Sequence, residues 1–201
     1  MLKKLLIATA ILATSSTIAL AGAPYVGVGL GVNNFSSKLT DTDNTINKFG
    51  ARSALVNVFG GYGALVNQTI YLGGEVFFTE APATAKVTSS DGDYAKLTSN
   101  YSYGISFIPG VMLSEHTMAY LRAGIVRGHF NSKASADGAY ASKSQNATGG
   151  QLGLGLQTSV SQNIDLRGEY VYTSYRSFNV AGTKVSSGTD QFTLAAIYKF
   201  D

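Results

Sequence analysis

The chain contains few of the side chains that usually carry out catalysis. It has no cysteine and only two histidines, His116 and His129, so thiol chemistry and cysteine-ligated metal sites are excluded. A lipid deacylase would need a serine beside an oriented histidine. Ser132 follows His129 at a spacing of three, whereas neighbours on one face of a strand are two residues apart. We therefore predict that the protein is not an enzyme and has no catalytic residues.

Charged side chains inside apolar, alternating segments are the strongest candidates for a functional site. Each of them shares its face with small or polar residues and stands opposite leucine, valine or aromatic residues. An ionised group that faced lipid would cost several kcal/mol, so these charges should point inward and pair. We predict a lumenal charge cluster of Glu75, Arg122, Arg167 and Glu169, with Asp165 and Lys199 as candidates for extending it.

Two interpretations of this cluster remain open. It is either an ionic gate or selectivity site of a narrow pore, or a polar plug, because side chains nearly fill the interior of a small barrel.

Other patterns carry less information. The glycines of Gly27–Gly31 are not followed by a helix, so they do not form a nucleotide-binding loop. Asp41, Asp43 and Asn47 lack the central glycine and closing glutamate of a calcium-binding loop, so we expect no metal and no cofactor.

The elements that position these side chains are predicted to be strands. Of the 201 residues, 45% are hydrophobic and only 13% are charged. No internal stretch approaches the ~20 apolar residues that a membrane-spanning helix needs. Instead, Val26, Val28, Leu30 and Val32 alternate with glycine, and this period of two is typical of strands. The hydrophobic share of this chain resembles that of a soluble protein because it averages over an apolar strand face and a polar one.

Eight segments have this pattern and the length of a tilted membrane-crossing strand. They cover residues 25–33, 53–63, 69–79, 99–112, 118–130, 151–160, 164–175 and 191–200, and their connections are alternately long and short. We predict an all-β fold: an eight-stranded antiparallel up-and-down transmembrane barrel with short periplasmic turns and four long extracellular loops. A lipocalin-like barrel would need the apolar face inside.

Some details follow from single residues. Asp91-Gly92 and Asp137-Gly138 are typical of hairpin tips beyond the membrane, and Pro109-Gly110 within a strand predicts a bulge. Aromatic side chains should mark the two rims of the membrane. We place Phe78, Tyr101, Tyr103, Tyr172 and Phe192 at the outer rim, and Tyr62, Tyr198 and Phe200 at the periplasmic rim.

The first 21 residues have the pattern of a cleaved signal peptide. Lys3 and Lys4 precede an apolar run, and Ala19-Leu20-Ala21 is a typical signal-peptidase motif. We therefore predict cleavage before Gly22 and a single barrel domain over residues 22–201. The mature chain would have 13 basic and 12 acidic residues, a net charge of +1. Without a basic stripe, nucleic-acid binding is not expected.

Several stretches also carry a family resemblance. They are Gly60-Gly61-Tyr62-Gly63, Tyr71-Leu72-Gly73-Gly74-Glu75, Tyr103-Gly104-Ile105-Ser106 with Ile108-Pro109-Gly110, and Leu166-Arg167-Gly168-Glu169-Tyr170. From about Tyr25 to Phe200, the chain resembles opacity-type and outer-membrane-protein-A-like eight-stranded surface barrels. The resemblance implies a bacterial outer-membrane location, contact with outer-membrane lipid and lipopolysaccharide, and insertion by the barrel-assembly machinery. Tyr198 and Phe200 are the implied assembly signal, although Asp201 follows the usual terminal aromatic residue.

Three functions remain for such a chain. The leading hypothesis is a non-enzymatic surface barrel with a structural, envelope or adhesin-like role. Host-cell or matrix ligands would then contact loop residues such as Lys38, Lys86, Tyr94, Lys133, Tyr140 and Phe178. The second hypothesis is a small pore or transport channel that uses the charged lumen. The third is a lipid-modifying enzyme of the deacylase or palmitoyltransferase type.

Overall fold

The computed structural model describes residues 22–40, 46–88, 94–136, 139–176, 178–180 and 183–200. The strands in chain order are β1 (Gly22–Thr40), β2 (Ile46–Leu65), β3 (Ile70–Thr88), β4 (Tyr94–Met112), β5 (Thr117–Ala136), β6 (Ala139–Ser159), β7 (Ile164–Tyr175), β8 (Phe178–Val180) and β9 (Thr183–Lys199). No described segment forms a helix that is long and apolar enough to cross a bilayer.

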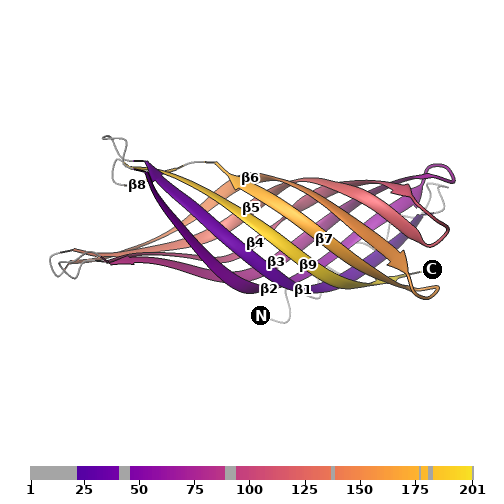
Figure 1. The fold of residues 1–201 in the computed structure, drawn as a ribbon, viewed down its shortest axis with the longest axis horizontal. Coiled ribbons are helices and arrows are strands. Elements are labelled where there is room, and N and C mark those ends of the chain that lie inside the picture. The colour runs from indigo at the N-terminus through magenta and orange to yellow at the C-terminus, as the bar shows by residue number, and fades with distance from the viewer. Residues whose placement is uncertain are drawn as a thin grey trace.

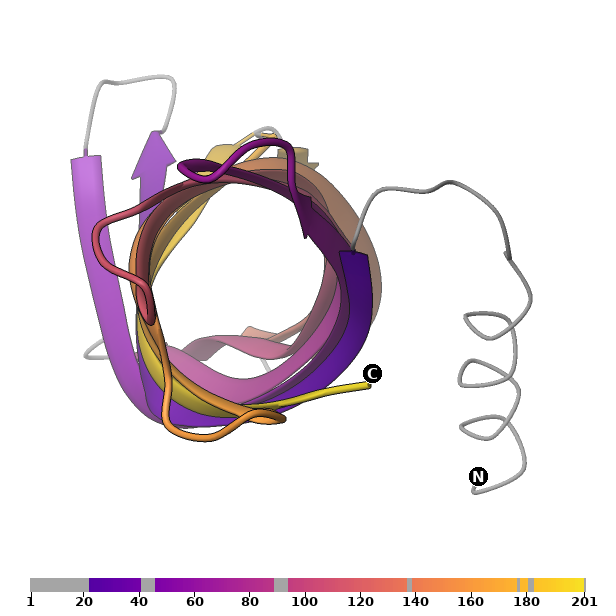
Figure 2. The same cartoon turned by 90° about the vertical axis from the view of Figure 1, so that its right-hand side faces the viewer.

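Eight long strands close into one antiparallel barrel, as Figures 1 and 2 show from the side and along the axis. Each strand pairs with its neighbours in sequence, and β9 pairs with β1 to close the ring, from Tyr25↔Lys199 to Thr40↔Lys184. The three-residue strand β8 pairs only with β9, beside the barrel wall. The predicted fold class is therefore confirmed. Within the closed ring, each strand pairs on both sides and its backbone groups are satisfied without help from water.

The short connections lie together at one end of the barrel. They cover residues 66–69, 113–116 and 160–163. Side chains hold these turns: the Asn67 Oδ1 accepts hydrogen bonds from the N–H groups of Thr69 and Ile70, at 2.8 and 2.7 Å. Phe200 donates its N–H to the carbonyl of Pro24 at the same end. Both ends of the described chain thus lie at the short-turn end.

Most residues of the long connections continue the strands, as the predicted hairpin tips imply for the β3–β4 and β5–β6 connections. The β1–β2 ladder extends to Thr40↔Ile46, the β3–β4 ladder to Thr88↔Tyr94, and the β5–β6 ladder to Ala136↔Ala139. Strands of 19 to 21 residues are about twice as long as a membrane crossing needs. The predicted tips at Asp91-Gly92 and Asp137-Gly138 lie outside the described residues, between the last pairs of their ladders.

The outward face is apolar over a belt at the middle of the barrel. Leucine is usually buried in a protein that is surrounded by water, but Leu30, Leu121 and Leu152 expose 66%, 61% and 67% of their surface. On β1 the belt ends where Asn34 and Ser36 replace valine and leucine on the same face. The eight aromatic residues predicted for the rims all face outward and are exposed. This face is built to contact lipid, as the alternating pattern predicts.

The predicted bulge at Pro109-Gly110 is wrong. The β4–β5 register is the same on both sides of this dipeptide, at Phe107↔Ala123 and Gly110↔Tyr120. Val111 is still exposed and Ile108 is fully buried, so the alternation continues through it. The register shifts instead between Glu80 and Ala83 on β3, and between Ser99 and Tyr101 on β4. Both irregularities lie at the outer edge of the apolar belt, where strand bending disturbs no lipid contact.

The lipid belt gives a direct test of this arrangement. Val28 lies in the middle of the belt on β1, whereas Ser36 lies beyond it on the same face of the same strand. We expect Val28→Arg to lower the unfolding free energy by about 2–4 kcal/mol and Ser36→Arg by about 0–1 kcal/mol. Urea titration of protein refolded into lipid vesicles measures both. Equal effects would contradict the assigned depth of β1.

Candidate functional site

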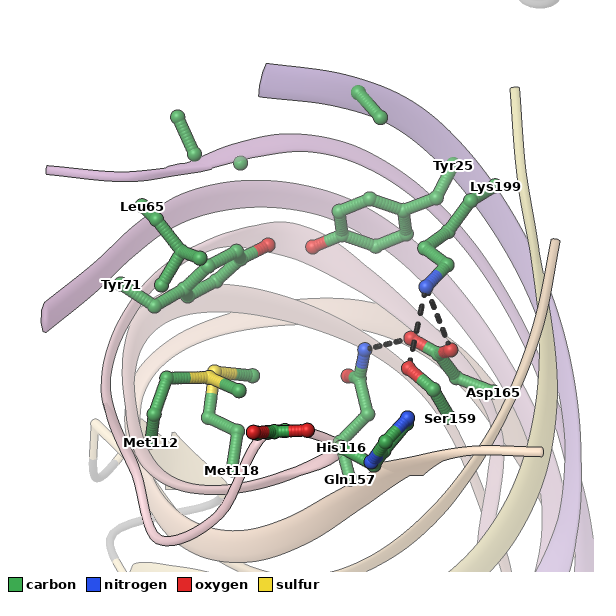
Figure 3. A pocket seen from close by; sticks show the side chains of 14 residues that line it. Tyr25, Leu65, Tyr71, Met112, His116, Met118, Gln157, Ser159, Asp165 and Lys199 are labelled. Atoms are coloured by element: carbon green, nitrogen blue, oxygen red, sulfur yellow. Dashed lines mark hydrogen bonds and ion pairs between the residues drawn. The ribbon is translucent and has the colours of Figure 1, made fainter. Parts of the chain in front are cut away.

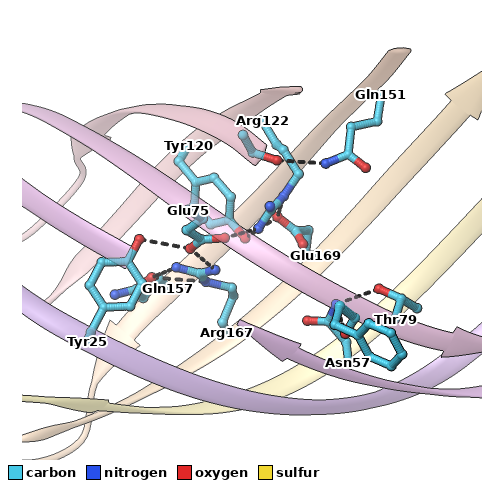
Figure 4. A network of polar contacts seen from close by, with 12 residues as sticks. Tyr25, Asn57, Glu75, Thr79, Tyr120, Arg122, Gln151, Gln157, Arg167 and Glu169 are labelled. Atoms are coloured by element: carbon cyan, nitrogen blue, oxygen red, sulfur yellow. Dashed lines mark hydrogen bonds and ion pairs between the residues drawn. The ribbon is translucent and has the colours of Figure 1, made fainter. Parts of the chain in front are cut away.

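The structure places Glu75, Arg122, Arg167 and Glu169 in one network inside the barrel (Figure 4). Arg122 donates from Nη2 to the Glu75 Oε2 at 2.5 Å and from Nε to the Glu169 Oε1 at 2.6 Å. Arg167 donates from Nη1 to the Glu75 Oε1 at 2.5 Å. The four predicted residues therefore form a chain of alternating charge with Glu75 between the two arginines.

The network crosses the lumen from one wall to the other. Glu75 comes from β3, Arg122 from β5, and Arg167 and Glu169 from β7, which is opposite β3 in the ring of eight strands. The Glu75 side chain is 0% exposed and that of Arg167 is 2% exposed. Ions so fully withdrawn from water are stable only when each is paired and hydrogen-bonded. The two positive and two negative charges in this network cancel.

Neutral polar side chains complete the hydrogen bonds of the network. Tyr25 on β1 donates its hydroxyl to the Glu75 Oε1 at 2.9 Å, and Tyr120 on β5 donates to the Glu169 Oε1 at 2.8 Å. The Gln157 Oε1 accepts from the Nε and Nη2 of Arg167, at 3.1 and 2.8 Å. These three residues were not identified as site residues from the sequence.

The network continues toward the short-turn end through the predicted candidates Asp165 and Lys199. Gln157 donates from Nε2 to the Asp165 Oδ2 at 2.6 Å, and the Lys199 Nζ lies 2.9 Å from the Asp165 Oδ1. The Lys199 ammonium also donates to the Ser159 Oγ at 3.3 Å. Residues of β1, β3, β5, β6, β7 and β9 are thereby joined through side chains alone.

Glycine makes room for the tyrosines of the network. Tyr120 is held against Gly155 on β6, where a Cβ atom would collide with the ring and hydroxyl. At Gly61 on β2, a Cβ atom would lie 2.7 Å from the Tyr25 hydroxyl. Inward-facing glycines therefore have a packing role here, as expected for a narrow barrel.

Aromatic side chains close the lumen on the long-hairpin side of the ions and pack around Arg167. Toward the long hairpins, Phe35, Phe130 and Tyr175 pack together with ring centroids 6.2 Å (Phe35–Phe130) and 5.1 Å (Phe130–Tyr175) apart. The guanidinium of Arg167 lies 4.7 Å from the Phe59 ring centroid and 5.1 Å from that of Tyr120. These contacts stabilise the cation and leave it no access to water.

A cavity of about 300 Å³ lies at the short-turn end (Figure 3). Met112, Met118 and Tyr71 line one side of it, and Lys199 and Asp165 line the other. The cavity ends at the ionic network, because Tyr25 and Gln157 belong to both. It is therefore a vestibule with a closed inner end in this structure.

The two histidines lie apart from this network. His116 is exposed in the short turn between β4 and β5, as predicted. His129 faces outward, stacks on Tyr101 at 5.1 Å and bonds to the Asn146 Oδ1 through Nδ1 at 2.8 Å. Neither imidazole ring bonds to a serine hydroxyl among the described contacts; the Ser114 Oγ accepts from the backbone N–H of His116 at 3.4 Å. Among the described residues, no group of three histidine, aspartate or glutamate side chains is arranged to hold a metal.

Other predicted residues are placed as follows. Tyr198 and Phe200 are exposed on the lipid face, with ring centroids 5.1 Å apart in an edge-to-face contact. Their role as an assembly signal stays a prediction. The side chains of the candidate loop contacts Lys38, Lys86, Tyr94, Lys133, Tyr140 and Phe178 lie outside the described part, as do Asp41 and Asp43 and the predicted signal peptide.

Comparisons with known proteins agree on the architecture. A family model described as an outer membrane protein beta-barrel domain matches residues 5–200. Neisserial surface protein A is 19% identical, with 86% of this chain and 97% of that chain covered and a TM-score of 0.51. The outer membrane protease OmpT from Escherichia coli is 7% identical, with coverage of 92% and 99% and a TM-score of 0.56.

A third similar structure is Ail, the attachment invasion locus protein of Yersinia pestis. It is 19% identical, with 88% of this chain and 98% of that chain covered and a TM-score of 0.43. No curated protein matches the sequence of this chain. At these identities, the likeness to solved structures speaks for the fold alone.

The network predicts an order of stability losses. Glu75→Gln leaves two buried arginines without their shared carboxylate and should lower the unfolding free energy by about 3–5 kcal/mol. Glu169→Gln should cost less, because the Glu169 side chain is 11% exposed and pairs with one arginine. Urea titration in detergent micelles gives both values. A larger loss for Glu169→Gln would contradict the central position of Glu75.

Proposed function

We propose that this chain, which belongs to the outer membrane protein beta-barrel family, is a non-enzymatic surface barrel of a bacterial outer membrane that binds partners through its long hairpins. In this proposal the short turns face the periplasm and the long hairpins face the cell exterior. That orientation follows the general rule for outer-membrane barrels. The signal peptide is cleaved before Gly22, and Tyr198 and Phe200 are recognised by the barrel-assembly machinery.

The filled lumen supports a structural barrel over a pore. Ions cross a channel only where water or polar groups offer a continuous path. Here the ionic network and the Phe35–Phe130–Tyr175 layer block the axis in turn. The charged residues of the lumen bind each other, so no described cation or anion of this cluster is left to select a passing solute.

The histidine contacts support a non-enzymatic barrel. His129 is occupied by Tyr101 and Asn146, and His116 is an exposed turn residue. The likeness to the protease OmpT is at 7% identity and concerns the fold. The described positions of both histidines are therefore accounted for without a catalytic role.

The observation that carries the binding proposal is a set of unpaired strand edges beyond the membrane belt. The β2–β3 pairing begins at Val56↔Glu80, and the β6–β7 pairing begins at Gly149↔Tyr175. Above these points, the described hairpins form two separate sheets, β8-β9-β1-β2 and β3-β4-β5-β6, which diverge on the left of Figure 1. Residues 46–55, 83–88 and 139–147 therefore each have a sheet neighbour on one side only.

Free edges of this length suit one mode of recognition. An unpaired strand presents N–H and C=O groups that an extended segment of another protein can pair with. Main-chain pairing of this kind tolerates changes in side chains, which fits surface hairpins that are exposed to varied partners. Adhesion to a host-cell or matrix protein would then depend on the edges more than on the hairpin tips.

Recording from planar bilayers tests the closed lumen. We expect neither the wild-type protein nor Glu75→Ala to produce stepwise openings, because the aromatic layer remains in both. A porin in the same bilayer is the positive control. Large stable channels in wild type would contradict the plug, and openings that appear only in Glu75→Ala would favour the second candidate function, a pore gated by the lumenal charges.

Adhesion of expressing bacteria to epithelial monolayers tests the hairpin edges. One variant joins Asn131 to Ser144 by an Asn-Gly turn and so removes most of the β6 edge while keeping the register Asn131↔Ser144. The matched control carries a Gly-Ser insertion after Gly138 and keeps the edge. We expect adhesion to fall in the shortened variant and to persist in the control. Loss of adhesion in both variants would assign binding to the tip, and persistence in both would contradict a role for the β6 edge.

A further inference from the structure

Both methionines of the predicted mature chain lie at one short turn, and one of the two histidines lies between them. Met112 ends β4, Met118 is the second residue of β5, and His116 is the last residue of the turn that joins these strands. The third methionine, Met1, belongs to the predicted signal peptide. The segment 112–118 thus holds two thioethers and an imidazole, which are all potential ligands of a soft metal ion.

The strand geometry turns the two thioethers toward each other. Met112 and Met118 are cross-strand partners in the β4–β5 ladder. The next pair toward the turn is hydrogen-bonded, because Leu113 donates its N–H to the Thr117 carbonyl at 2.8 Å. Met112 and Met118 therefore form a non-hydrogen-bonded pair, the kind in which side chains approach most closely, with Cβ atoms about 4.5–5.5 Å apart.

Both methionine side chains point into the vestibule at the short-turn end (Figure 3). Met118 is 5% exposed, and Met112 is partly buried against the same cluster of side chains. The Met118 Sδ lies over Gly110 of β4, where a Cβ atom would come within 2.7 Å of it. Gly110 and Met112 share the inward face of β4 because they are two residues apart. The Met118 sulfur is thereby held against the strand that carries Met112.

His116 can supply a third ligand. It lies two residues before Met118, lines the same vestibule and is exposed. Its backbone N–H donates to the Ser114 Oγ, whereas its imidazole ring has no hydrogen bond or ion pair in the described part of the chain. Glu115 also lines the vestibule and adds a negative charge beside the three ligands. A cation that enters the vestibule therefore meets two sulfur atoms and a free ring nitrogen.

The types of donor atom select the metal. Thioethers are soft ligands that favour copper(I), and imidazole also binds copper. A neutral thioether lacks the negative charge with which a thiolate holds zinc(II). Calcium and magnesium need oxygen ligands, and histidine, aspartate and glutamate side chains form no metal group among the described residues. The expectation of no metal concerned oxygen ligands at Asp41, Asp43 and Asn47, so it does not extend to thioethers.

We propose that Met112, Met118 and His116 bind one copper(I) ion in the vestibule. Two sulfur atoms and one ring nitrogen are the ligands, the ion keeps its oxidation state, and Glu115 offsets its charge. The ion joins the end of β4 to the start of β5 across their turn. Packing alone does not require methionine here, because leucine fills a core site of similar volume. Binding depends neither on the hairpins nor on the orientation of the barrel.

Titration with silver(I) in chloride-free buffer tests the site, since silver(I) is a soft monovalent ion that is stable in air. Isotope labelling of the methionine methyl groups gives one NMR signal for each of the three methionines of the full chain in detergent micelles. We expect the signals of Met112 and Met118 to shift together until one equivalent is bound, while the signal of Met1 stays in place. A shift of neither signal, or of only one, would overturn the site.

Conservative variants separate metal binding from packing. Met112→Leu with Met118→Leu keeps the apolar volume but removes both sulfur atoms. Loss of even an outer partner of a metal ligand weakens affinity about 10–100-fold, so we expect this double variant to bind silver(I) about a hundredfold more weakly or worse. His116→Gln should weaken binding about tenfold or more. Unchanged affinity in His116→Gln would overturn the three-ligand site, and unchanged affinity in the double variant would overturn the proposal altogether.

The other histidine provides the matched control. His129 stacks on Tyr101 at the outer face of the barrel, away from the vestibule. We expect His129→Gln to bind silver(I) as tightly as the wild type. A loss equal to that of His116→Gln would overturn the assignment of the ligand. Migration of the unheated protein in gels reports the folding of every variant.

Copper(I) and zinc(II) test the selectivity of the site. Copper(I), kept reduced by ascorbate and measured by competition with a chromogenic chelator, should bind the wild type and respond to each variant as silver(I) does. Zinc(II) should bind about tenfold more weakly or worse. Equal binding of zinc(II) would overturn a soft-metal site. Metal binding involves neither host cells nor current, so its failure is distinguishable from a failure of the proposed hairpin binding or of the closed lumen.

Discussion

A strand in a bilayer has to satisfy its backbone hydrogen bonds with other strands, and this constraint sets the rest of the structure. The ring closes through β1 and β9, and eight strands leave an interior that is only as wide as its side chains. Every inward side chain must then fit this narrow interior, and every inward charge must be paired. Glycine at positions such as Gly155 supplies the room, and paired charges supply the compensation.

The ionic network is the costly part of that solution. Burial of Glu75 and Arg167 removes both from water, and their attraction offsets this cost only while every partner is present. Because the network joins β3 to β7 across the lumen, it also fixes how opposite walls are arranged. A barrel with an apolar interior can be as stable, so the ions here define one packing of the lumen, which the Phe35–Phe130–Tyr175 layer also closes.

The sequence alone was sufficient for the barrel, its strand order and the lumenal cluster, since a period of two assigns each residue to a face. It also placed Glu75, Arg122, Arg167 and Glu169 on the inward face. It did not reveal the length of the β1–β2 hairpin, because polar strands above the membrane lack an apolar face. It also missed Tyr25 and Gln157, whose contacts depend on the stagger between strands far apart in sequence.

The central claim is that Glu75 and Arg167 hold opposite walls together inside a closed lumen. A double-mutant cycle of Glu75→Gln and Arg167→Gln, read by urea unfolding in micelles, measures their coupling directly. The account predicts a coupling energy of about 2 kcal/mol or more, since each single change leaves a buried partner unpaired. Additive effects of the two substitutions would contradict it, because they would mean that the two side chains do not meet across the barrel.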